Sequence, residues 1–206
     1  MFLVPLVILG GVEAALRWAG HGYDASFLLE RTVQGERMVV QNDKFGWRFF
    51  PPSVARSPSP LSFRAAKRPG TTRIFLFGES AALGDPKPAY GFGRYLEALL
   101  KERFPGTGFE VICVAMTAIN SHAILPIARE CARYDGDLWV VYMGNNEMEG
   151  PFGANTLFGA QAPELSVIRA SLALRSTRLG QWLVGIFHEF VQLVSGLVIA
   201  LVRCRC

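Results

Sequence analysis

The sequence predicts an α/β protein in which helices pack against a parallel sheet. Three short apolar runs, at 73–77, 109–114 and 138–143, have the length and composition of buried parallel strands. The two segments between them, 92–104 and 122–134, have helical patterns. Strands that alternate with helices indicate βαβ units with right-handed crossovers. We therefore expect a three-layer α/β/α domain, with a further apolar helix at each end of the chain.

The boundaries of this domain follow from turn residues. The helix predicted at 92–104 repeats apolar residues at three- and four-residue spacing and ends at Pro105-Gly106. Pro163 marks the first position of another helix, which continues to about Leu179. The sequence thus places the α/β domain at residues 73–181.

Two apolar segments, 1–20 and 182–206, flank the domain. Residues 2–12 are apolar apart from proline and glycine, which favours a membrane anchor or signal-like helix, with a buried N-terminal helix as the alternative. Residues 182–202 have the length of a membrane span, with a helix lying on the membrane as the alternative. Together the two segments predict a membrane location, and we expect the domain on the extracytoplasmic side. Arginines on both sides of residues 182–202 leave the orientation of that segment open.

Residues 21–72 lack clear periodicity and contain a cluster of prolines between 51 and 60. We expect an extended connection into the domain, with a possible strand at 45–50.

The composition indicates which classes of ligand and partner are disfavoured. Half of the 206 residues are hydrophobic, and the net charge of +4 comes from basic residues that are scattered along the chain. Such scattering does not favour nucleic-acid binding. Four cysteines without a Cys-x-x-Cys motif, together with three histidines, disfavour a structural zinc site. No metal or other cofactor is predicted.

Polar side chains follow the first and third predicted strands. Ser80 comes just after the first strand, and Asn146 follows the third. The carboxyl ends of parallel strands meet at one edge of a sheet, where open α/β sheets bind their ligands. A serine and an asparagine at that edge are suited to acyl transfer, as nucleophile and oxyanion donor.

The two motifs together resemble those of the SGNH, or GDSL-type, hydrolase family. The family's first block, Gly-Asp-Ser, is similar to Gly78-Glu79-Ser80, and its third block, Gly-x-Asn-Asp, to Gly144-Asn145-Asn146-Glu147. Glutamate replaces aspartate in both, and the resemblance covers about residues 71–160. It implies a flavodoxin-like fold and hydrolysis of a small acyl or glycan ester.

The resemblance also implies residue roles. Ser80 would be the nucleophile, and the Asn146 side chain would bind the oxyanion together with the backbone N–H groups of Ser80 and Ile119. Ile119 stands where the family's second block normally has glycine. The loop after Ser80 would line the site through Gly84, Asp85 and Tyr90, although an ordinary Pro/Gly loop is the alternative.

The catalytic base is missing from the pattern. The chain has no Asp-x-x-His, and Ala82 breaks the Gly-x-Ser-x-Gly motif of ordinary α/β-hydrolases. His122 is an improvised candidate base, or else a solvated histidine at a helix start, and His188 lies in the apolar tail. Either the chain is an incomplete copy, or it is a non-hydrolytic variant that binds an acyl or glycan ligand. A non-catalytic, membrane-associated binding or scaffold protein is the alternative function.

Overall fold

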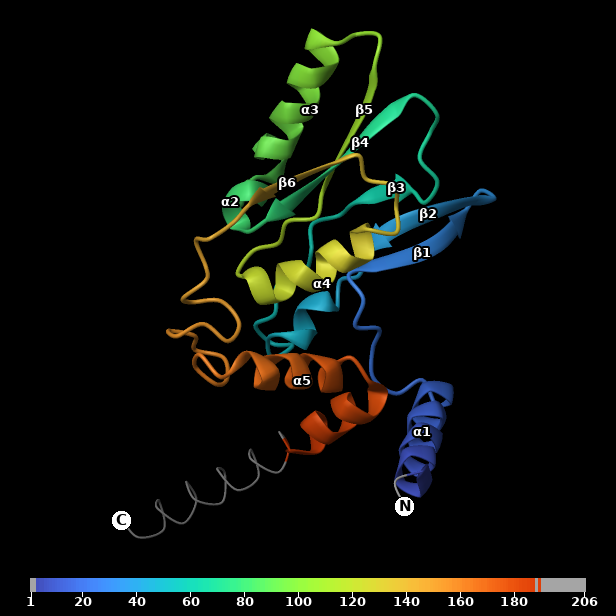
Figure 1. Ribbon diagram of the computed structural model, residues 1–206, viewed down its shortest axis with the longest axis vertical. Coiled ribbons are helices and arrows are strands. Elements are labelled where there is room, and N and C mark those ends of the chain that lie inside the picture. The colour runs from blue at the N-terminus through green and yellow to red at the C-terminus, as the bar shows by residue number, and fades with distance from the viewer. Residues whose placement is uncertain (1–2, 188, 190–206) are drawn as a thin grey trace. The chain divides into compact units, whose positions relative to one another are not determined.

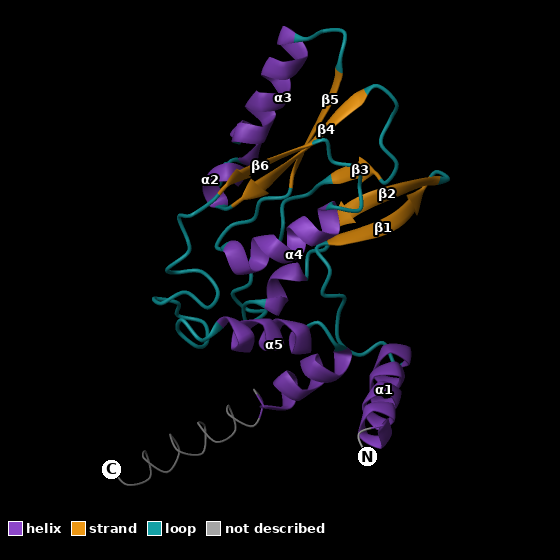
Figure 2. Cartoon of the chain, in the orientation of Figure 1, coloured by secondary structure: helices purple, strands orange, loops and turns teal. Residues whose placement is uncertain are grey.

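The computed structural model describes residues 3–187 and 189. The chain divides into two compact units, one formed by residues 26–164 and the other by the two ends of the chain, 1–25 and 165–206. The elements are labelled along the chain in Figure 1 and coloured by type in Figure 2. The unit of residues 26–164 contains two three-stranded sheets.

The parallel sheet confirms the predicted α/β class. Its strands are β4 (Thr71–Gly78), β5 (Gly108–Cys113) and β6 (Leu138–Tyr142), in the order β5-β4-β6. Both neighbours run parallel to β4. As the central strand, β4 is buried on both faces from Arg73 to Gly78, which explains its continuous apolar run.

Helices connect the parallel strands as the periodicity predicts. They are α2 (Ser80–Leu83), the 3₁₀ turn η2 (Pro88–Tyr90), α3 (Phe92–Arg103) and α4 (Ser121–Cys131). The helix α3 packs on β5, and α4 packs on β4 and β1. Gly93 brings α3 close to the sheet, because a Cβ there would lie 3.0 Å from the Leu76 side chain.

A second sheet occupies much of the segment that we expected to be an extended connection. Its antiparallel strands are β1 (Leu28–Val33), β2 (Glu36–Gln41) and β3 (Ser62–Arg64). Gln34 and Gly35 both have positive φ, 52° and 80°, and form the two-residue hairpin turn between β1 and β2. Residues 21–72 are therefore largely part of the same compact unit as the parallel sheet.

The strand predicted at 45–50 is wrong. Phe45–Arg48 forms the 3₁₀ helix η1. The helical turn brings Phe45 and Phe49 together with ring centroids 5.3 Å apart, and Phe45 also packs edge-to-face on Phe27 at 5.0 Å. Burial of this aromatic cluster outweighs the strand preference of aromatic residues.

Arg73, near the start of β4, is fully buried and joins the two sheets. Its Nε donates to Glu110 on β5 at 2.7 Å, and its Nη2 donates to the carbonyl of Arg64 at the end of β3 at 2.9 Å. Its Nη1 donates to the carbonyl of Tyr134 at 2.8 Å, just before β6. One guanidinium thus donates to acceptors from three chain segments, and a buried charge requires such partners.

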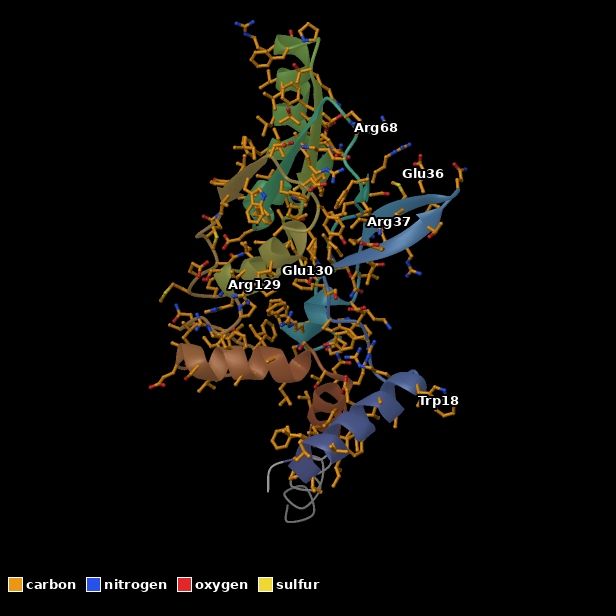
Figure 3. All side chains as sticks on the ribbon, turned by 45° about the vertical axis from the view of Figure 1, so that its right-hand side comes forward. Trp18, Glu36, Arg37, Arg68, Arg129 and Glu130 are labelled. Atoms are coloured by element: carbon orange, nitrogen blue, oxygen red, sulfur yellow. The ribbon has the colours of Figure 1, made fainter. Side chains whose placement is uncertain are left out.

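Glu130, labelled on α4 in Figure 3, holds that helix to the start of β1. Its carboxylate accepts hydrogen bonds from the backbone N–H groups of Phe27 and Leu28 at 2.9–3.0 Å. Burial raises the pKa of the Glu130 carboxyl, although these two donors act in the opposite direction. The contact fixes where the antiparallel sheet begins relative to α4.

The unit formed by the chain ends consists of helices and short connections in its described part. It contains α1 (Leu3–Trp18), α5 (Leu165–Arg175) and a helical segment over residues 178–187. The carboxylate of Glu13 accepts the backbone N–H groups of Arg178 and Leu179 at 3.0 and 2.8 Å, and so caps the start of that segment.

The predicted membrane location is contradicted. No helix within residues 3–187 and 189 is long and apolar enough to cross a membrane. The N-terminal helix α1 has 16 residues, fewer than the roughly 20 that a span requires. None of its residues is buried, so the alternative of a buried N-terminal helix is also wrong. The predicted span at 182–202 lies mostly outside the described residues.

Replacing Arg73 by methionine should destabilise the protein strongly. The change keeps much of the side-chain volume but removes every donor from the buried carbonyls, so we expect a loss of about 3 kcal/mol in the free energy of unfolding. Urea unfolding followed by circular dichroism measures it. Arg64→Met removes a half-exposed ion pair with Glu36 and should cost less than about 1 kcal/mol. Equal effects of the two changes would contradict the role given to Arg73.

Asp137 should contribute to acid sensitivity. The hydrogen bond from Lys67, and then the one from the Arg73 backbone N–H, hold the pKa of Asp137 below its ordinary value of 3.8. Its stabilising effect is therefore complete above that ordinary value and is lost as the pH falls through the lower pKa of the folded state. In urea titrations, the stability difference between wild type and Asp137→Asn should shrink below about pH 4. A stability difference that stays constant down to low pH would contradict the role given to Asp137.

Candidate functional site

The carboxyl ends of the three parallel strands meet at one edge. Gly78 ends β4 opposite Tyr142 of β6, and its carbonyl accepts the N–H of Met116, just after β5, at 3.2 Å. A Cβ at Gly78 would collide with the Tyr142 carbonyl oxygen and with Ala82. Glycine is needed here because the strands approach each other closely at the point where the chain turns into α2.

Glu79 connects the first and third motifs. Its side chain is fully buried, and its carboxylate accepts the backbone N–H of Asn145 at 2.8 Å and that of Asn146 at 3.2–3.3 Å. A buried carboxylate needs such donors, because without them the charge would lack any replacement for water. The loop after β6 is therefore held against the residue that precedes Ser80.

Further hydrogen bonds join the loop after β6 to the loop after β5. The side-chain amide of Asn146 donates to the Ile119 carbonyl at 3.1 Å. The Glu147 carboxylate accepts both the N–H and the hydroxyl of Ser121, at 2.9 and 2.7 Å, at the start of α4. These contacts confirm that the motif residues of three separate strands lie at one edge of the sheet.

Ser80 is the first residue of α2 and is half-buried. Its carbonyl accepts the N–H groups of Gly84 and Asp85, which close the short helix. Within the described part of the chain, its hydroxyl makes no hydrogen bond. The hydroxyl thus lies at the strand end, as the sequence predicts, and no residue among 3–187 and 189 activates it through a hydrogen bond.

His122, the candidate base, is the second residue of α4. Its ring packs edge-to-face on Phe152, with centroids 5.9 Å apart. No hydrogen bond joins it to Ser80 among residues 3–187 and 189. His188 lies outside the described residues.

One part of the predicted ligand loop is held by contacts within the chain, and the other part is exposed to solvent. Gly84 ends α2 in the left-handed conformation, with φ 85°. The Asp85 carboxylate accepts the Thr117 hydroxyl at 3.1 Å, which joins this loop to the one after β5. Tyr90 is 68% exposed, so its side chain is not held by packing.

The residue before Ile119, in the loop after β5, has an unusual backbone conformation. Ile119 is fully buried, whereas Ala118 has φ 65°, a conformation that favours glycine. The sequence could not reveal the positive φ at Ala118, because the φ of a loop residue depends on the contacts around it. Strained residues of this kind concentrate at functional sites.

Asn120 is a buried polar residue that the sequence did not single out. It is fully buried, its amide donates to the Pro151 carbonyl at 2.9 Å, and its side-chain oxygen has no partner in the described part of the chain. Its position directly after Ile119 was the available signal. The contact holds the loop after Glu147 to the start of α4.

A hollow of about 420 Å³ lies beside this edge. It includes Asn146 and Ala118 from the predicted site, but neither Ser80 nor His122. Its complete lining is Phe50, Ala118, Asn146, Glu149, Gly150, Asn155, Leu157 and Phe158. A larger hollow, of about 460 Å³, lies along β5 and α3 and contains none of the predicted catalytic residues.

No protein-family model, curated protein or solved structure matches this chain. Within residues 3–187 and 189, no three His, Cys, Asp or Glu side chains come together as metal ligands would. The chemistry of the site therefore has to be argued from its own residues.

Glu79→Gln should weaken the attachment of the loop after β6 to the end of β4. Glutamine offers one acceptor oxygen in place of two and turns its NH₂ toward the N–H donors, so we expect a loss of about 2 kcal/mol in stability. Amide hydrogen exchange measured by NMR should become faster at Asn145 and Asn146 first. Glu102→Gln, an exposed change on α3, should leave both rates unaltered. Unchanged protection in Glu79→Gln would show that the carboxylate does not hold this loop.

Proposed function

We propose that the chain is an SGNH-type ester hydrolase domain in which Ser80 attacks a small acyl or glycan ester. The observation that carries this proposal is the Glu79 contact, which brings the Gly-acid-Ser and Gly-x-Asn-acid motifs together at one sheet edge. The contact supports the proposal because it holds at one place the two motifs on which the resemblance rests.

The donors at this edge suit an oxyanion. The Asn146 NH₂ group has two hydrogens, and the bond to the Ile119 carbonyl uses one of them. The other is available to a developing negative charge, together with the backbone N–H groups of Ser80 and Ile119. Each such donor contributes about 3–4 kcal/mol to transition-state stabilisation in comparable sites.

Ester hydrolysis would be slow, because no general base lies beside the Ser80 hydroxyl among the described residues. A serine hydroxyl is a poor nucleophile at neutral pH until a neighbouring group takes its proton. The Ser80 hydroxyl has no hydrogen-bond partner among the described residues, and the ring of His122 packs on Phe152. We expect stoichiometric acylation by strong electrophiles to be easier to detect than ester hydrolysis.

The fold proposal goes with the functional one. The path from β4 to β5 crosses the sheet in one direction, and the path from β5 to β6 crosses it in the other. If both crossovers are right-handed, α3 and α4 cover opposite faces, as in a three-layer SGNH-type fold.

A non-catalytic binding protein is the second candidate. The observation that favours it is the hollow beside Asn146, whose lining omits Ser80. An acyl or glycan group could be held there by the Asn146 amide and by the side chains of Phe50 and Phe158, with no covalent step.

Labelling with a fluorophosphonate probe separates the two candidates. If Ser80 is the nucleophile, wild type should be labelled at Ser80, Ser80→Ala should lose the label, and Ser53→Ala, an exposed control, should keep it. Asn146→Ala should slow labelling by about 10²-fold, because the adduct loses an oxyanion donor. Peptide mass spectrometry locates the label. No labelling of folded wild type would leave the binding protein as the better description.

A further inference from the structure

The strand β6 forms an open edge of the parallel sheet. Within residues 26–164 it pairs with β4 alone, so its outer row of N–H and C=O groups has no partner strand. The side chains of Leu138, Trp139, Val141 and Tyr142 are exposed, at 52%, 41%, 56% and 52%. An exposed, uninterrupted apolar edge is a template for pairing with another strand.

The other edge strands of residues 26–164 are protected. The strand β1 carries Glu30 and Arg31 in its middle, and β3 has three residues and ends at Arg64. The strand β5 contains Glu110, which pairs with Arg73, and α3 packs on it. Charged residues and short length are the ordinary means of preventing edge pairing. Among these four edges, β6 is the one without a charged residue.

The sequence of β6 is complementary to itself. In an antiparallel pair centred on Val140, Trp139 lies opposite Val141, and Leu138 lies opposite Tyr142. Every pair is apolar, and the aromatic–aliphatic pairs stabilise a sheet. One step outward, Asp137 lies opposite Met143, so no two like charges face each other.

We propose that β6 pairs antiparallel with β6 of a second copy of this chain, about a two-fold axis through Val140. Self-complementarity is what a two-fold interface requires, because the same patch serves both partners. The two parallel sheets then join into one six-stranded sheet. This inference does not depend on Ser80 being a nucleophile, because it uses the open edge of β6 and none of the predicted catalytic side chains.

The molecular mass of the full chain in solution tests the proposal. Light scattering during gel filtration should give twice the 22.7 kDa of one chain. Val141→Lys puts a charge into the pair and should give the single-chain mass. Val33→Lys on β1 is the matched control, since Val33 and Val141 are 51% and 56% exposed, and it should remain dimeric. Circular dichroism shows whether each variant is folded.

A cross-link tests the register without a destabilising charge. Residues opposite each other in an antiparallel pair have Cα atoms about 4.5–5.5 Å apart, within the reach of a disulfide. Oxidised Val140→Cys should therefore give a covalent dimer, and peptide mass spectrometry should join position 140 to position 140. Val33→Cys should give no corresponding link.

Three results would overturn the proposal. They are a wild type with the mass of one chain, an assembly that persists in folded Val141→Lys, and a folded Val140→Cys protein that does not cross-link at position 140. A larger assembly that keeps its mass in Val141→Lys would place the interface elsewhere on the chain.

Discussion

The buried guanidinium of Arg73 is the interaction on which the arrangement of residues 26–164 depends. It lies near the start of the central strand and donates to acceptors on β3, on β5 and just before β6. Burying such a charge removes its water and is unfavourable. A buried charge is tolerated only where its hydrogen-bond donors find acceptors. The contacts therefore admit one relative placement of the two sheets, whereas apolar packing alone would tolerate several.

A second buried charge, Glu79, directly follows the same strand, and this one organises the candidate site. Its carboxylate binds the loop after β6, and through Asn146 and Glu147 that loop binds the loop after β5. The contacts that hold the site together therefore come from the chain's own residues. Preorganised donors of this kind stabilise a developing charge without reorganising during the reaction. The strand thus has a structural charge near one end and a site-organising charge at the other.

Much of the parallel sheet could be predicted, because burial on both faces leaves a continuous apolar run and amphipathic helices leave a 3.6-residue period. The antiparallel sheet could not. In β2 only Val39 is fully buried, so the strand shows no clear alternation, and its pairing with β1 depends on the positive φ at Gln34 and Gly35. The sequence allows a strand at 45–50, but the structure has a helical turn there, and in it Phe45 contacts both Phe27 and Phe49.

By itself the sequence determined the α/β class, the three parallel strands and the placement of Ser80 and Asn146 just after the carboxyl ends of two of them, because each follows from local pattern and from the direction of parallel strands. Only the tertiary structure decided that Glu79 joins the two motifs, that Ala118 rather than Ile119 has the left-handed backbone, and that His122 packs on Phe152. It also showed that no helix among residues 3–187 and 189 is long and apolar enough to cross a membrane. Those outcomes depend on which distant groups compete for each donor, acceptor and apolar surface, and local sequence carries no record of that competition.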